Sequence, residues 1–167
     1  MMDDIDDDYD LEVLLELRQR ERDEAEQRYV EAMEDHRRLG RRIQELEHRR
    51  REMVSKRERE RRSFEQKMAD GGGKLAEIQS FDRYVAGLRD EEQKLVDKLE
   101  GLRRQHRRAR EAMEQAHDEM VDAVRDLEAV NEHYESWRRQ KETDERRRRE
   151  AKMDDVAARM WRDNQSN

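Results

Sequence analysis

Histidine is the side chain of this chain best suited to hold a transition metal. The sequence has five: His36, His48, His106, His117 and His133. A metal site on one helix needs two of them three or four residues apart, so that both imidazoles share a face. No two of the five have that spacing. His36 and His106 become near neighbours only if the chain folds back on itself, where polar residues that set the register of two paired helices are the simpler interpretation.

Catalytic groups of other kinds are no better placed. Carboxylates are abundant, but a solvated helix gives them no dry pocket that could shift their pKa values. Three glycines at 71–73 precede Lys74, yet Leu75 stands where a phosphate-binding loop needs Ser or Thr, and no strand is evident before them. The absence of cysteine excludes disulfides and thiolate metal sites and fits a reducing compartment. We therefore predict no enzyme activity, no metal and no cofactor.

The composition predicts long helices. Half of the 167 residues are charged, only 32% are hydrophobic, and proline is absent. So few apolar residues cannot fill a compact core, which leaves either disorder or a narrow apolar seam along each helix. The wealth of Glu, Arg, Lys, Gln, Leu, Met and Ala favours helix. No apolar run is long enough to cross a membrane and the acidic start is unlike a signal peptide, so we expect a cytoplasmic protein without direct membrane insertion.

Charge argues against nucleic acid as a partner. The net charge is −7, and residues 1–10 contribute six aspartates and no basic residue, which leaves residues 11–167 close to neutral. The arginine-rich runs are interleaved with glutamate four residues away, as in Glu58 with Arg62 and Glu142 with Arg146. Such pairs support a solvated helix. Binding of nucleic acid or anionic lipid by these runs is the less favoured alternative.

A seven-residue repeat supplies the seam. Before the glycines, one stripe is mostly apolar and its companion is weak: Leu11, Arg18, Ala25, Ala32, Leu39, Leu46 and Met53, with Leu15, Arg22, Tyr29, His36, Ile43, Arg50 and Arg57. After them, the stripe is apolar throughout: Phe81, Leu88, Leu95, Leu102, Ala109, Ala116, Ala123, Val130 and Trp137. Its companion four residues on is apolar at six of nine positions: Val85, Glu92, Leu99, His106, Met113, Met120, Leu127, Tyr134 and Lys141. A heptad register held this long predicts left-handed coiled-coil packing. The polar positions in the first half predict a marginal pairing.

The glycines between the two registers are interpreted as a bend, because left-handed glycine ends helices cheaply. The competing interpretations are a phosphate loop and a linker between independent domains. We predict an all-α, two-helix antiparallel coiled-coil hairpin whose second helix is longer than the first, with residues of opposite helices summing to about 143. Residues from about His133 onward should then lack a partner in the first helix. The bend residues are Asp70, Gly71, Gly72 and Gly73. The expected segments are a disordered N-terminus at 1–10, a first helix at 11–69, a bend at 70–80, a second helix at 81–160 and a disordered C-terminus at 161–167. The start of the second helix stays open between a position just after Gly73 and a cap at Ser80.

Several stretches in this order resemble the FliJ/YscO proteins of type III secretion. They are the opening "DLEVLLELRQRERDEAEQRYVEA", the Gly-rich break, "FDRYVAGL" after it, and the late "WRRQKETDERRRREAKMDDVAAR". The resemblance runs from about Leu11 to Arg159. Each motif alone is loose, because any charged coiled coil shares its composition, and the arrangement carries the specificity.

The resemblance implies a central stalk of a type III export apparatus, peripheral to the inner membrane. Its implied partners are the hexameric export ATPase, the cytoplasmic domain of the export-gate membrane protein, and export chaperones, for which no residues are assigned. For the gate, the matching positions are Phe81, Tyr84 and Leu88, whereas Glu91 and Leu95 depart from the family pattern. Phe81 and Leu88 also lie on the seam, so Tyr84 is the better candidate for an external contact. For the ATPase ring, the implied contacts are Leu11, Leu14, Leu15, Trp137 and Met153.

Two alternatives stay open. A generic coiled-coil adaptor or scaffold, for example a parallel homodimer through residues 81–137, fits the same composition. Within the resemblance, the charged arms and the length favour the injectisome type slightly over the flagellar type.

Overall fold

The computed structural model describes residues 3–165, with side chains from Asp10 onward. These residues form two helices and no strand: α1 spans Asp3–Ala69 and α2 spans Leu75–Gln165. The second helix, with 91 residues, is longer than the first, with 67. The predicted all-α hairpin is confirmed.

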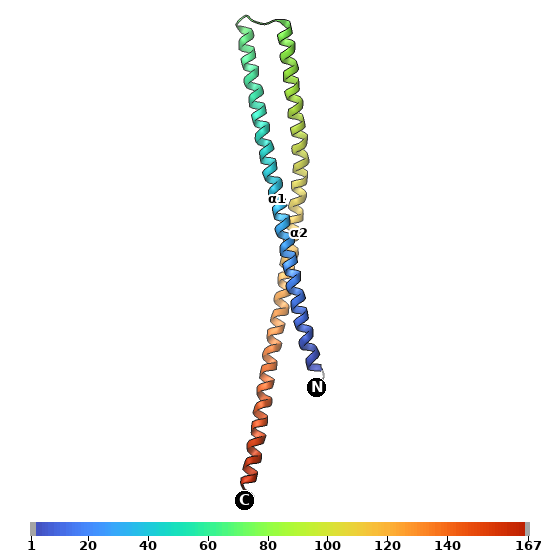
Figure 1. Cartoon of the computed structure of the whole chain (residues 1–167), viewed down its shortest axis with the longest axis vertical. Coiled ribbons are helices and arrows are strands. Elements are labelled where there is room, and N and C mark those ends of the chain that lie inside the picture. Colours follow the sequence, from blue (N-terminus) through green and yellow to red (C-terminus); the bar gives the residue numbers. More distant parts are fainter. Residues whose placement is uncertain (1–2, 166–167) are drawn as a thin grey trace. The chain divides into compact units, whose positions relative to one another are not determined.

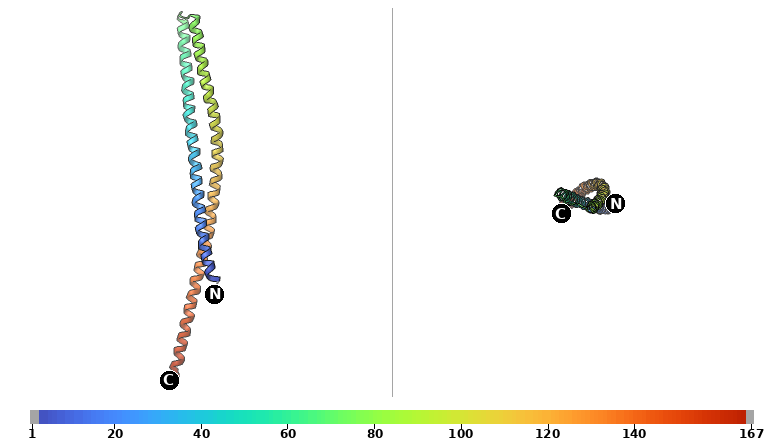
Figure 2. Two further views of the ribbon diagram at one scale, coloured as in Figure 1. Left: turned by 45° about the vertical axis from the view of Figure 1, so that its right-hand side comes forward. Right: turned by 90° about the horizontal axis from the view of Figure 1, so that it is seen from above.

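Contacts divide the chain into two compact units. Residues 27–117, which include the connection between the helices, are called the bend unit. Residues 1–26 together with 118–167 are called the terminal unit. In the bend unit, the later part of α1 and the first part of α2 lie side by side and antiparallel (Figure 1 and the left view of Figure 2).

The heptad positions are the ones that the fold covers. Ala25, Leu46 and Leu99 are the buried hydrophobic residues of the described chain, and all three lie on the predicted stripes. The other stripe positions are half-buried, with the exception of the exposed Arg50. A two-helix pair can bury only one narrow strip on each helix, so the core is a seam of isolated contacts and not a packed interior.

The connection is a short loop at residues 70–74. The backbone N–H of Gly71 donates to the carbonyl of Met68 at 3.2 Å, and Gly71 has a φ of +90°, a conformation that side chains with a Cβ rarely adopt. The carbonyl of Lys74 accepts from the N–H groups of Glu77 and Ile78 at 2.9 and 3.3 Å, which opens α2. Glu77 in that first turn favours the helix start electrostatically.

The structure corrects three predicted boundaries. α1 begins at Asp3 and not at Leu11, since aspartates are favourable near a helix N-terminus. α2 begins at Leu75, which agrees with the open alternative of a start just after Gly73 and not with a cap at Ser80 or a start at residue 81, because residues 75–80 hold no Gly or Pro to stop the helix. α2 also continues past residue 160 to Gln165. The predicted disorder at residues 1–2 and 166–167 lies outside the described residues.

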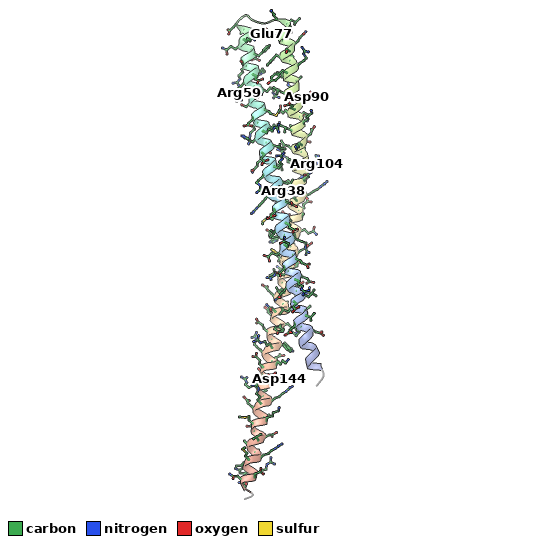
Figure 3. The ribbon with its side chains drawn as sticks, in the orientation of Figure 1. Arg38, Arg59, Glu77, Asp90, Arg104 and Asp144 are labelled. Carbon is green, nitrogen blue, oxygen red and sulfur yellow. The ribbon has the colours of Figure 1, made fainter. Side chains whose placement is uncertain are left out.

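In the terminal unit, α2 continues past the start of α1. The expectation that pairing ends at about His133 is wrong, because the phenolic hydroxyl of Tyr134 donates to a carboxylate oxygen of Glu12 at 3.3 Å and Trp137 is still half-buried. From Asp144 to Gln165 every residue is exposed, and no described part of α1 lies alongside (Figure 3).

Neither helix, over the described residues, has a stretch long and apolar enough to cross a membrane.

Candidate interaction surfaces

An aromatic cluster lies in the bend unit close to the loop. Phe64 of α1 and Phe81 of α2 stack nearly parallel, with ring centroids 3.9 Å apart and 8° between their planes. The ring of Tyr84 lies 6.4 Å from that of Phe81, one helical turn away. Both phenylalanines are half-buried, whereas Tyr84 is 42% exposed. The cluster therefore presents one amphipathic aromatic ring to solvent and uses the other two to join the helices.

The hydroxyl of Tyr84 is held from the opposite helix. It donates a hydrogen bond to the carboxylate of Glu60 on α1, and this bond, followed by desolvation and by the charges of Glu60 and Glu91, raises the pKa of Tyr84. Tyr84 consequently keeps its proton throughout the physiological range. Two contacts, one through the ring and one through the hydroxyl, give the side chain a defined orientation on the surface.

Of the three residues expected at the export gate, the structure brings Phe81 and Tyr84 into one cluster. Leu88 is half-buried on the seam one turn later. Leu75 and Ile78, which the sequence did not single out, are 71% and 38% exposed on the preceding turns of α2. Phe64 and Glu60 were also missed, although an antiparallel register with a sum near 143 already places α1 residues 59–62 opposite residues 81–84.

The residues expected at the ATPase ring fall into two separate groups. Leu11, Leu14 and Leu15 are half-buried on α1 in the terminal unit. On α2 of the same unit, Trp137 stacks against Tyr134 at 5.9 Å and lies under the ammonium group of Lys141 at 4.6 Å. Tyr134 is hydrogen-bonded to Glu12 of α1, so the three leucines and Trp137 lie at about the same position along the helix pair.

Met153 stands apart from that group. It follows Trp137 by sixteen residues, about 24 Å along a helix. It is 74% exposed and belongs to a stripe with Val156, Met160 and Trp161, which are 53%, 69% and 63% exposed. The spacing of three, seven and eight residues puts these side chains on one face of α2, and that spacing was the signal that could have found them.

Polar side chains on the seam are paired across the helices in the bend unit. The carboxylate of Glu92 on α2 receives Arg57 of α1 through a hydrogen bond and Arg50 at 3.5 Å. The side chain of Glu92 is only 16% exposed. Nearby, Arg103 of α2 reaches Glu47 of α1 at 2.7 Å. Arg50 and Arg57, which predict a weak seam, are therefore both paired with the carboxylate of Glu92 on α2.

The histidines do not form a metal centre. His36 and His106 do meet across the helices, but their rings are stacked, with centroids 4.2 Å apart and planes 19° apart. Stacked rings direct their nitrogen lone pairs side by side and not toward one ion. Over the described residues, no three His, Cys, Asp or Glu side chains gather as a metal site requires.

Comparison with known proteins gives one match. A search of curated proteins and a search of solved structures each find no match. The family model for YscO-like proteins matches residues 6–167, nearly the whole chain. The chain belongs to the YscO-like family, a structural family associated with type III secretion.

Proposed function

We propose that this protein is a central stalk component of a type III export apparatus that contacts the hexameric export ATPase and the cytoplasmic domain of the export gate. The observation that carries the proposal is the family match over residues 6–167. The injectisome type is proposed in preference to the flagellar type, on the highly charged arms and the length of 167 residues.

The proposed gate contact is centred on Tyr84. It is the exposed member of the aromatic cluster, and its orientation is set by Phe81 and Glu60. Tyrosine has few rotatable bonds, so it loses little conformational entropy when a partner covers it, which suits it to an interface. Phe81 and Leu88 are proposed to support this contact from the seam.

The proposed ATPase contact uses the terminal unit. Leu11, Leu14, Leu15 and Trp137 form a half-buried apolar surface, and Met153 begins an exposed stripe with no described part of α1 against it. Exposed apolar side chains at helical spacing are typical of a helix that docks in a groove. Export chaperones are proposed as further partners without assigned residues.

The test of the ATPase contact uses the purified full-length chain and its cognate export ATPase. We expect the chain to raise the rate of ATP hydrolysis, and Met153→Glu to reduce this stimulation severalfold. Leu75→Glu is the matched control, since Leu75 is equally exposed but lies in the bend unit. No stimulation together with no co-purification of ATPase or gate protein would refute the proposal.

The test of the gate contact is a pull-down with the cytoplasmic domain of the gate protein. Tyr84→Ala should weaken capture at least tenfold, whereas Ile78→Ala, a similarly exposed position two turns earlier, should not. The adaptor alternative is separated by light scattering and by an intrachain cross-link between Phe64→Cys and Phe81→Cys, whose native rings stack across the two helices. A dimer that lacks this cross-link favours a homodimeric adaptor.

A further inference from the structure

The stacked histidines of the bend unit are a feature that the proposed stalk function does not use. His36 comes from α1 and His106 from α2, and both are half-buried on the seam. Neutral imidazoles stack favourably as aromatic rings. Each imidazole carries a charge only when it is protonated. The interaction between the two rings can therefore change from attraction to repulsion with pH, unlike the ion pairs along the same helices.

The pair is set closely between the helices. A Cβ placed on Gly40 of α1 would lie 3.4 Å from Nε2 of His106, in van der Waals contact. His106 therefore lies against the bare backbone of α1 at Gly40, one turn from His36.

The charges that act on His106 come from both helices. On α1 the group is His36, and on α2 it is Arg110, which is held by Glu114 at 2.9 Å. The nearest pair across the helices, Arg103 with Glu47, already has its charge balanced. Protonation of His106 thus meets a permanent cation on its own helix and a second ionisable imidazole on the other.

These surroundings lower the pKa of His106 from its ordinary value of 6.5, first through desolvation, then through His36 and Arg110. A histidine whose pKa is lower in the folded state than in the unfolded state binds fewer protons when folded. Stability is then unaffected above about pH 6.5 and falls as the pH drops below that value, until the folded-state pKa is passed.

We propose that the His36–His106 pair is a pH-sensitive joint: the stacked rings hold α1 against α2, and in mild acid the opened helices take up a proton at His106 that the closed pair excludes, so this level of the bend unit opens more readily. The device is independent of any partner and therefore of the proposed function. It acts on the bend unit alone, since both histidines lie there.

The experiment is thermal unfolding of the full chain at pH 7.5 and pH 5.5, with EDTA present so that adventitious metal has no part. His106→Phe keeps an aromatic ring that cannot be protonated, and His36→Gln removes the charge without adding volume. We expect the fall in Tm between the two pH values to be larger for the wild type than for either variant, by about 2–4 °C. Comparing falls, and not absolute Tm values, removes any packing defect of a variant.

His48→Gln is the matched control. His48 is a solvent-exposed histidine of α1 that lies 3.2 Å from Glu52 on the same helix and has no stacked partner on α2 among the described contacts. This variant should lose as much Tm in acid as the wild type. Equal falls in the wild type, His106→Phe and His36→Gln would overturn the proposal. Hydrogen-exchange protection factors, which are corrected for the slower intrinsic exchange in acid, would overturn it as well if they fell equally along the whole chain and not chiefly around residues 36 and 106.

Discussion

The two units differ in how they accommodate arginine at seam positions. Each has arginines on a stripe where a coiled coil prefers leucine. In the bend unit, Arg50 and Arg57 share the carboxylate of Glu92 across the seam. In the terminal unit, Arg18 binds Glu21 and approaches Asp126 at 3.6 Å, yet its buried Nε has no hydrogen-bond partner, and neither has Nε of Arg22.

The difference shows that polar seam residues do not weaken a helix pair by themselves. Their effect depends on whether every buried nitrogen and oxygen finds a partner. The bend unit meets that condition and also contains Leu46 and Leu99, whereas the buried hydrophobic residue of the terminal unit is a single alanine, Ala25. We therefore expect the bend unit to be the more stable of the two.

The largest expected effect is the loss of the buried leucine. Leu99→Ala removes a side chain that is 1% exposed and should reduce the free energy of unfolding by about 2–5 kcal/mol. Leu15→Ala, at a half-buried seam position of the terminal unit, should cost less. Urea unfolding followed by circular dichroism measures both. An equal loss in the two variants would remove the contrast between the units.

The next effect comes from the shared carboxylate. Glu92→Gln leaves two guanidinium groups on the seam without an anion, and we expect a loss of about 2 kcal/mol that persists in high salt. Glu114→Gln breaks an exposed pair with Arg110 and should cost under about 0.5 kcal/mol. If the two variants lose the same free energy, or if salt abolishes both losses, the Glu92 pair has no special role.

A smaller effect is expected at the loop. Gly71→Ala forces a residue with a Cβ into a positive φ and should destabilise the bend unit by about 1–2 kcal/mol. Gly72→Ala is the control, because Gly72 has an ordinary φ and the nearest atom to its Cβ position is 3.9 Å away. Thermal unfolding compares them. A tolerant Gly71 would mean that the loop has other conformations available.

The smallest effect should be a gain. Arg22→Leu removes a buried nitrogen that has no partner and fills the seam, so the free energy of unfolding should rise by about 1 kcal/mol. Arg57→Leu, the same change in the bend unit, should lower it, because Glu92 loses its closest partner. Two changes of the same sign would show that seam arginines are equivalent in both units.

The heptad pattern was enough to predict the fold and the seam, because a seven-residue repeat dictates which face of each helix must be covered. It was also enough to place His36 opposite His106. It could not predict that Arg57 binds Glu92, since a long side chain reaches a full turn beyond its own level. The start of α1 was missed because aspartate disfavours helix interiors but suits a first turn.

The interaction surfaces were predicted less well, for a physical reason. Met153, Val156 and Met160 follow the same spacing as the seam, so periodicity alone cannot tell a stripe that meets α1 from one that does not. Only the length of α1 decides how far along α2 the apolar stripe is covered. The contribution of Phe64 and Glu60 to the surface around Tyr84 depends in turn on an exact register.

The exposed end of α2 has a thermodynamic consequence. From Asp144 onward, helix is supported by pairs within one helix, such as Arg147 with Asp144 and Arg149 with Glu145, each contributing a few tenths of a kcal/mol. Its nucleation is already accomplished by the covered part of α2, so each further turn needs only propagation. Melting should therefore advance inward from Gln165 in small steps. A protein that binds the Met153 stripe would shift this helix–coil equilibrium, and its affinity should fall with temperature more steeply than that of a preformed surface.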